Sequence, residues 1–319
     1  MKKIFFAAVA VVAMASCSKD EVIELNREQI GFGEAFVDNG TRADYSSGND
    51  IQEFKVYGTL TGSGNTVQIF NGANVTRPTD LASGVYDQTK AWICTEVQYW
   101  VPSASYEFAA IVDGVATETT GLPATIPFTV ADGVDNKDLL YATATVTTGA
   151  NANPTTGVNG EGFVAFTFDH LLSKVQFTVA NEMAVNYSIK VTGITVTGVA
   201  QDGIYTVGAA TPWAKNGDAT TTLTFGTTGV IDSANTAGAS ETRQILPVEQ
   251  TLAVTIAYDI NYKGTKVAST TKSGNIPAQT YQKNTVYNIT AKINATKIQF
   301  SVESVGGFND STGGDINVQ

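Results

Sequence analysis

The chain has 319 residues, of which 43% are hydrophobic and 15% charged, so it is long enough for two domains and too apolar to be wholly disordered. Its formal net charge of −11 argues against binding to nucleic acid or to an anionic membrane by charge alone. Two cysteines are too few for a disulfide scaffold, and the 30 glycines favour twisted sheets and turns over helices.

Residues 1–16, MKKIFFAAVAVVAMAS, have the pattern of a secretory signal peptide: two lysines, an apolar stretch, then small residues. The apolar part is too short for a convincing membrane span. The small residues before Cys17 resemble the lipobox of bacterial lipoproteins, which implies cleavage before Cys17 and acylation of it. Several acyl chains, at about 0.8 kcal/mol per buried methylene, would anchor the precursor firmly. The following SKDE is similar to the acidic export tags of surface lipoproteins in the Bacteroidetes.

The next stretch, EQIGFGEAF over residues 28–36, alternates apolar and other residues, as a half-buried β-strand does. Ile30, Phe32 and Phe36 are expected to point into a groove at an open sheet edge of the same chain. There the segment would block the groove until a strand of another subunit replaces it. Gly31 and Gly33 make this segment a weaker filler than a strand without glycine. We refer to this segment as the leader strand.

Arg42 lies in DNGTRADY, a polar segment with glycine of the kind that proteases cut. Cleavage between Arg42 and Ala43 would release both the lipid and the leader strand, which makes residues 17–42 a propeptide. Arg27 is a second possible cleavage site, but a cut there would leave the leader strand attached. The alternative is that Arg42 is an ordinary loop residue.

From residue 51 onward, short runs of period-2 alternation recur between turn-forming residues, a pattern that predicts β-sandwiches. The first series is EFKVYGTL, YEFAAIVDG, TIPFTVADG, DLLYATATV and GFVAFTF, and the second is KVQFTVAN, SIKVTGITVTG, TTLTFG, LAVTIAYDINYKG and TVYNITAKI. Roughly seven strands in each half indicate two sandwiches in tandem, over residues 43–170 and 171–295. The boundary is placed near DHLLSK, residues 169–174.

Candidate chemistry is sparse. The single histidine, His170, follows Asp169, but adjacent residues of an extended chain point to opposite faces, so a hydrogen-bonded structural histidine is favoured over a catalytic one. The acids Asp132, Asp135 and Asp138 lack the glycine and distal glutamate of a calcium loop, which favours a solvated turn. We therefore predict no enzyme activity, no cofactor and no metal site.

Cys94 lies in the strand-like KAWICTEV, where a buried free thiol is the ordinary expectation. Four aromatic residues nearby could form a platform for a sugar or belong to a sandwich core: Trp92, Tyr99, Trp100 and Tyr106. The first possibility keeps open a glycan-binding surface lipoprotein.

The tail, residues 296–319, adds one more alternating segment, KIQFSVESV, after the last strand of the second sandwich. It is expected to be a donor strand for the groove of another subunit, with Ile298, Phe300, Val302 and Val305 as its apolar residues. DINVQ offers a second short piece. Burying four or five such side chains would contribute roughly 6–12 kcal/mol before ordering costs.

An ordered set of motifs runs along the chain: the lipoprotein signal, IGF…TRA, YW followed by YEFAA, DLLYA, and FTFDHLLSKVQFTV. With this set the chain resembles the fimbrillin family, the type V pilins of Bacteroidales, over nearly its whole length. The resemblance implies two tandem transthyretin-like seven-stranded β-sandwiches with an N-terminal pro-strand and a C-terminal donor-strand extension. It also implies a lipoprotein precursor, Arg-specific maturation at Arg42 and Ala43, and polymerisation by strand exchange. Phe308 stands where many members carry a tryptophan, so stalk, tip and anchor roles stay open.

The leading hypothesis is therefore a structural subunit of a surface fimbria that supports adhesion. Its expected partners are copies of itself and related subunits, an Arg-specific protease and, before maturation, the outer membrane through the lipid. One alternative is a lipid-retained anchor or tip subunit whose mature form begins at acylated Cys17. The other is the glycan-binding surface lipoprotein.

Overall fold

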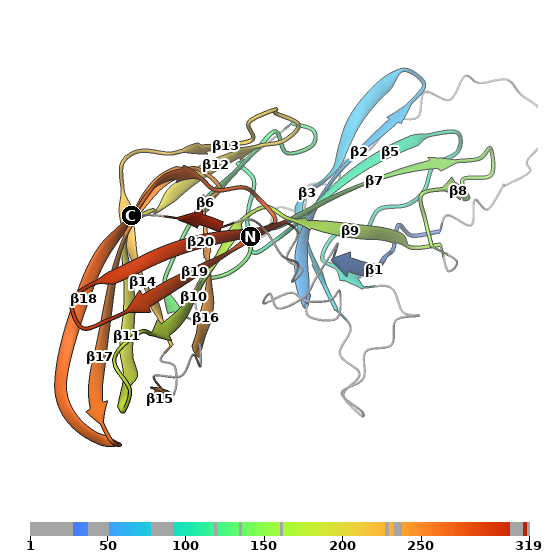
Figure 1. Ribbon diagram of the computed structural model, residues 1–319. Coiled ribbons are helices and arrows are strands. Elements are labelled where there is room, and N and C mark those ends of the chain that lie inside the picture. The colour runs from blue at the N-terminus through green and yellow to red at the C-terminus, as the bar shows by residue number, and fades with distance from the viewer. Residues whose placement is uncertain are drawn as a thin grey trace, which may run out of the picture.

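The computed structural model describes residues 28–37, 51–77, 92–117, 120–133, 136–159, 162–226, 230–232, 238–306 and 315–317. The signal peptide, Cys17, Arg42 and Ala43 lie outside these residues. Within these residues the regular elements are all β-strands, which confirms the all-β prediction. The described part of the chain contains no helix long and apolar enough to span a bilayer. The strands form two lobes joined end to end (Figure 1).

The N-terminal lobe is one sheet of eight strands in the order β1-β9-β7-β5-β2-β3-β4, with β8 beside β7. Its strands are β1 (Phe32–Val37), β2 (Glu53–Gly62), β3 (Asn65–Thr76), β4 (Ile93–Cys94), β5 (Ser105–Val112), β7 (Leu140–Thr148), β8 (Pro154–Thr156) and β9 (Val164–His170). Gln29 forms an isolated bridge with Tyr99, and Phe32 forms one with Trp92. These partners lie in the segment that contains β4, the strand at the other edge of the sheet, so the sheet nearly closes into a barrel. Alternation predicted the strands but not this closure, since a twisted sheet can curl on itself as well as stack on a second sheet.

The C-terminal lobe packs two sheets face to face. One has the order β16-β10-β19-β20-β21 and the other β14-β11-β17-β18, with β15 beside β11. Their strands are β10 (Ser173–Asn181), β11 (Tyr187–Ala200), β14 (Thr220–Phe225), β15 (Val230–Asp232), β16 (Gly238–Ile245), β17 (Glu249–Tyr262), β18 (Thr265–Thr280), β19 (Thr285–Ile293), β20 (Ile298–Gly306) and β21 (Asp315–Asn317). Inward residues such as Val254 and Ile289, both fully buried, form the core between the sheets.

A small third sheet joins sequence segments from both halves. Its order is β13-β12-β6, made of β6 (Thr125–Thr129), β12 (Asp202–Thr206) and β13 (Trp213–Lys215). The sequence pattern assigned β6 to the first sandwich, yet it pairs antiparallel with β12. The difference arises because alternation shows which face of a strand is buried and not which edge it pairs with.

The segment between β6 and β7 binds the lobes together through polar contacts. His170 Nδ1 lies 2.6 Å from Asp138 Oδ2, with both side chains fully buried. Asp132 accepts hydrogen bonds from the Thr224 N–H and hydroxyl, over 2.8 and 2.6 Å. The prediction of a solvated turn is therefore wrong for Asp138, which is fully buried, whereas Asp132 stays half-exposed; Asp135 lies outside the described residues.

His170 is the last residue of β9, at the point where the chain passes from one lobe to the other. His170 is buried and hydrogen-bonded, as predicted for a structural histidine, and the carboxylate that contacts its Nδ1 belongs to Asp138. Among the described residues no group of three or more potential ligands could hold a metal ion.

Asn136 provides a test of this junction. Its amide donates to Gln244 O over 3.0 Å, and its carbonyl accepts from Gln244 N–H over 2.7 Å. The Asn136→Ala variant is expected to lower the free energy of unfolding by about 1–3 kcal/mol, because buried polar groups lose their partner. Chemical denaturation of the full chain measures this. The control is Lys137→Ala, which removes an exposed ion pair with Asp113 and should change stability by less than about 1 kcal/mol. Equal effects of the two substitutions would show that the Asn136 contact contributes nothing.

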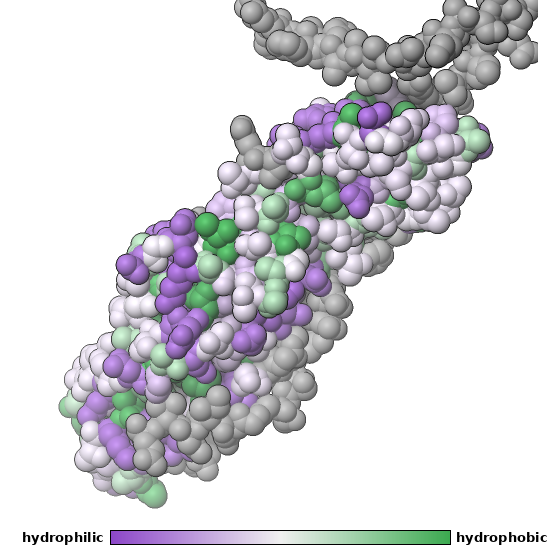
Figure 2. Space-filling model, turned by 90° about the horizontal axis from the view of Figure 1, so that it is seen from above, coloured by the Kyte–Doolittle hydropathy of each residue, from purple (hydrophilic) through white to green (hydrophobic). Residues whose placement is uncertain are grey.

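The molecule is elongated, and on the face seen in Figure 2 its apolar areas are small and scattered among pale and purple ones. Isolated surface apolar residues are normal, so this face gives no sign of a large hydrophobic interface.

Candidate functional site

The leader strand pairs with β9 on one side and with residues 92–100 on the other, and we call the position that it fills the groove. Figure 1 shows β1 beside β9 in the N-terminal lobe. It runs parallel to β9, with Phe32 opposite Val164 and Val37 opposite Phe168. Further backbone bonds hold it on both sides: Val164 N–H to Gly31 O (2.9 Å), Ile30 N–H to Gln98 O (2.8 Å), Trp92 N–H to Phe32 O (2.6 Å) and Trp100 N–H to Glu28 O (3.1 Å). Without this strand, two rows of backbone groups would lose their partners.

Phe32 is the anchor of the leader strand. It has no exposed surface, and its ring packs against four others, with centroid distances of 6.3 Å to Phe54, 5.5 Å to Phe70, 5.8 Å to Phe108 and 6.1 Å to Phe166. Ile30 is also buried, at 1% exposure. Burying both side chains contributes roughly 3–6 kcal/mol. The leader strand thus completes the core of the lobe as well as its sheet.

Gly33 marks the closest approach of the leader to its neighbour. A Cβ there would lie 3.1 Å from the Phe163 side chain, tighter than ordinary contact. The sheet also has an irregularity between Gly33 and Ala35. The glycine therefore suits this position sterically. The side chain of Phe36 lies outside the described part of the structure.

Residues 92–100 contact the leader strand on the side opposite to β9. The apolar–polar alternation of the sequence did not predict this pairing. Only β4 is a regular strand here, and the leader meets this wall through isolated bridges at Tyr99 and Trp92. The one available clue was the density of aromatic residues, which are frequent in cores. The leader is thus paired continuously with β9 and only at isolated bridges with residues 92–100.

The aromatic residues of this region do not form a sugar platform. Trp92, Trp100 and Tyr106 are 7%, 1% and 0% exposed, so of the two alternatives these three residues fit the core, and of the four only Tyr99 is exposed. Burial raises the pKa of the Tyr106 hydroxyl, which also accepts a 2.7 Å hydrogen bond from the Val101 N–H. These rings pack against the same core as Phe32 because the barrel interior needs large apolar volumes.

Cys94 is a free, half-buried thiol at the end of β4. Burial is the main cause that raises the pKa of this thiol, and the charge of Glu96 adds to the effect. A raised pKa leaves the thiol protonated and weakly nucleophilic, as in a structural cysteine.

The tail lies on its own C-terminal lobe. β20 pairs antiparallel with β19, from Ile293 opposite Ile298 to Val286 opposite Val305, and β21 pairs with β20. The alternation read from the sequence agrees with the structure: Phe300 and Val302 are 5% and 1% exposed, and Ile298 is half-buried. The Val305 side chain lies outside the described residues.

Gly274 on β18 makes room for the tail. A Cβ at this position would lie 2.8 Å from Phe300 Cε2, so only glycine allows the ring to pack so close to the facing sheet. Before β20, Asn294 Oδ1 accepts hydrogen bonds from the backbone of Thr296 and Lys297, forming a compact turn. The tail is therefore a regular strand attached through one short turn.

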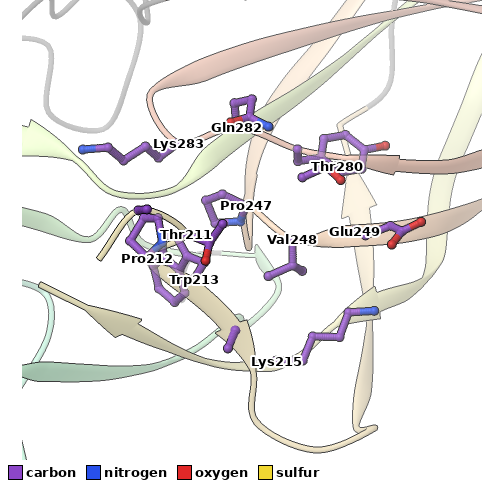
Figure 3. A pocket seen from close by; sticks show the side chains of 13 residues that line it. Thr211, Pro212, Trp213, Lys215, Pro247, Val248, Glu249, Thr280, Gln282 and Lys283 are labelled. Carbon is purple, nitrogen blue, oxygen red and sulfur yellow. The ribbon is translucent and has the colours of Figure 1, made fainter. Parts of the chain in front are cut away.

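A cavity of about 590 Å³ lies in the C-terminal lobe, beside β13 and the end of β18 (Figure 3). Its lining includes Trp213, whose indole N–H already donates to Leu171 O over 2.7 Å. Lys283 extends away from Lys215 and Glu249, so these charges do not converge on one point. The groove that holds the leader strand is the stronger candidate site.

Comparison with known proteins gives one family. The sequence pattern of the fimbrillin-like family matches residues 41–305, and that of the prokaryotic membrane lipoprotein lipid attachment site matches residues 1–18. No curated protein matches the chain.

Several solved structures share the fold. A fimbrial protein from Bacteroides vulgatus has a TM-score of 0.57 at 18% identity, covering 89% of this chain and 100% of that chain. A candidate cell adhesion protein from Bacteroides uniformis has a TM-score of 0.54 at 14% identity, covering 89% and 98%. One from Bacteroides ovatus has a TM-score of 0.54 at 11% identity, covering 89% and 99%. At these identities the likeness concerns the fold alone.

Proposed function

This chain belongs to the fimbrillin-like family and carries a lipoprotein attachment site, and from that premise we propose that it is a structural subunit of a surface fimbria that supports adhesion. In this proposal the subunit is exported as an outer-membrane lipoprotein through Cys17. Cleavage after Arg42 by an Arg-specific protease then removes the lipid and the leader strand. Polymerisation follows by donor-strand exchange with other subunits.

The observation that carries the proposal is the buried leader strand. It supplies backbone partners to both walls of the groove and places Phe32 at the centre of an aromatic cluster. Arg42 follows the leader strand by only a few residues, so cleavage there would sever the strand from the rest of its lobe. The vacated groove would expose apolar surface and unpaired edges, which favours insertion of another strand.

The tail supplies a strand of suitable pattern. Its Ile298, Phe300 and Val302 alternate with polar residues, as an inserted strand needs when one side is buried and the other faces water. In the described structure β20 packs on its own lobe, so donation requires that it leave β19. In the proposed exchange, β20 leaves the edge of β19 in its own lobe and pairs with the groove of another subunit.

We also propose the finer architecture that the family implies, with two transthyretin-like domains at residues 43–170 and 171–295. The change of sheet between β9 and β10 supports a division near this point. β6 is the exception, because it pairs with β12.

Amino-terminal sequencing of surface fimbriae tests maturation. The expected first residue is Ala43, and an Arg42→Ala precursor should stay unpolymerised because its leader strand still fills the groove. Arg27→Ala is the matched control and should mature normally. A mature protein beginning at acylated Cys17 would instead identify a lipid-retained anchor or tip subunit, a role that the lipid attachment site keeps open.

A further inference from the structure

The far end of the C-terminal lobe carries exposed apolar residues held by two turns. β10 begins beside the N-terminal lobe and ends at Asn181, so the residues near Asn181 mark the end remote from that lobe. There Val185 is 79% exposed and Tyr262 is 40% exposed. The Tyr187 and Tyr262 rings pack at a centroid distance of 5.0 Å. We call residues 185–187 and 262–263 the tip.

The tip is held in a fixed shape. Lys263 N–H donates to Asn186 O over 2.9 Å, which ties the two turns together. Asn186 and Lys263 have φ angles of 74° and 48°, in the left-handed region that non-glycine residues rarely adopt. Strained residues of this kind persist where their surroundings hold them, often at functional sites. Exposed apolar groups on such a rigid support are suited to docking.

The turn that leads into the tail lies at this same end. Ile293 is the last residue of β19, and its carbonyl accepts a 2.8 Å hydrogen bond from Glu182 N–H, three residues before Val185. Figure 1 shows the turn between β19 and β20, like the β17–β18 hairpin, at the end away from the N-terminal lobe. A tail that detaches from β19 therefore leaves the molecule next to the tip.

The groove opens at the opposite end of the molecule. β9 runs from Val164 toward the C-terminal lobe, and the leader runs parallel to it, so its first residues mark the outer mouth of the groove. Tyr99, 48% exposed, bridges Gln29 in this part of the leader. Val97, 52% exposed, precedes Gln98, whose carbonyl accepts a hydrogen bond from Ile30 N–H. We call residues 96–99 the groove mouth.

Resting on the proposed donor-strand function, we infer that the tip of one subunit docks on the groove mouth of the next, as a second, non-covalent contact of the fibre. If β20 replaces the leader in the same direction, Ile298 sits at the mouth. The chain from Ile293 to Ile298 spans at most about 17 Å when extended. This short tether brings the tip of the donor subunit against the mouth of the acceptor.

Charge agrees with this pairing. Lys263 at the tip and Lys297 beside it are exposed, whereas Glu96 at the mouth is exposed and acidic. Opposite charges on facing surfaces favour the correct encounter and fix its register. The occupant of the tip is therefore a second copy of this chain.

Cross-linking in assembled fibres tests the contact. Two subunits are mixed, both with Cys94→Ser, one with Val185→Cys and the other with Val97→Cys, and treated with a short bismaleimide. The expected result is a covalent dimer that survives boiling of the polymer. The matched control replaces Val97→Cys by Val115→Cys, which is 53% exposed and close in sequence to the junction end of β5, and should give no dimer.

The outcomes separate the two proposals. Polymers that form without the Val185–Val97 cross-link, or that link Val185 to position 115, overturn the docking inference and leave donor-strand assembly standing. Absence of any polymer from the matured subunits overturns both.

Discussion

Deletion of residues 296–319 is expected to abolish SDS-resistant polymers while leaving export of the precursor intact. The reason is that this segment holds the strand with the alternation needed to fill another subunit's groove, at Ile298, Phe300 and Val302. The effect should be all-or-none, since a groove with no donor cannot form a chain of subunits. Electrophoresis of unboiled surface material shows the presence or absence of ladders.

The deletion also removes Phe300 and Val302 from the core of their own lobe, so the folding of the variant has to be checked. A complementary experiment keeps the tail intact and adds a peptide of residues 296–305 to matured subunits. The peptide should occupy the groove and shorten the ladders, whereas a peptide with aspartate in place of Phe300 should not. Ladders that survive the deletion would contradict donor-strand assembly directly.

The Phe32→Ala precursor is expected to lose about 3–5 kcal/mol of unfolding free energy in its N-terminal lobe. Phe32 has no exposed surface and contacts rings from β2, β3, β5 and β9, so its removal leaves a cavity among parts that cannot all move inward. Denaturant unfolding, followed by a probe of that lobe, gives the difference.

Gln29→Ala is the matched control, because Gln29 belongs to the same strand and its side chain is exposed. It should change stability by less than about 0.5 kcal/mol. If Phe32→Ala behaved like this control, the leader strand would not be an integral part of the core. A weakened seal should also allow some assembly of the precursor without cleavage, which the same electrophoresis detects.

The tail deletion tests the strand that would enter the groove, and the Phe32→Ala variant tests the strand that fills it before cleavage. When the tail moves, the burial of Phe300 and Val302 is lost in one lobe and regained in another, so these terms largely cancel. In the proposed exchange, the net driving force would come from filling the groove that the leader has vacated. Under the proposed exchange, a strand already packed on its own lobe could therefore still serve as a donor.

Two features could not be settled from the sequence because they depend on which residues pack together. Asp138 looks like part of a polar turn in ADGVDNKD but is buried against His170, which follows it by 32 positions. Trp92 and Trp100 fit either a sugar platform or a core, and their side chains point into the barrel. Position in the sequence does not show whether an aromatic side chain faces solvent or the interior.

The all-β class, the alternation of the leader and the tail, and the hydrogen-bonded His170 could be predicted from the residues alone. These follow from local rules, because period-2 alternation shows which side chains of a strand are buried. Three features became visible only in the folded chain: the first sheet nearly closes into a barrel, β6 joins β12, and the tail lies on β19. Backbone edges are chemically alike in every strand, so the choice among them depends on how the whole chain packs.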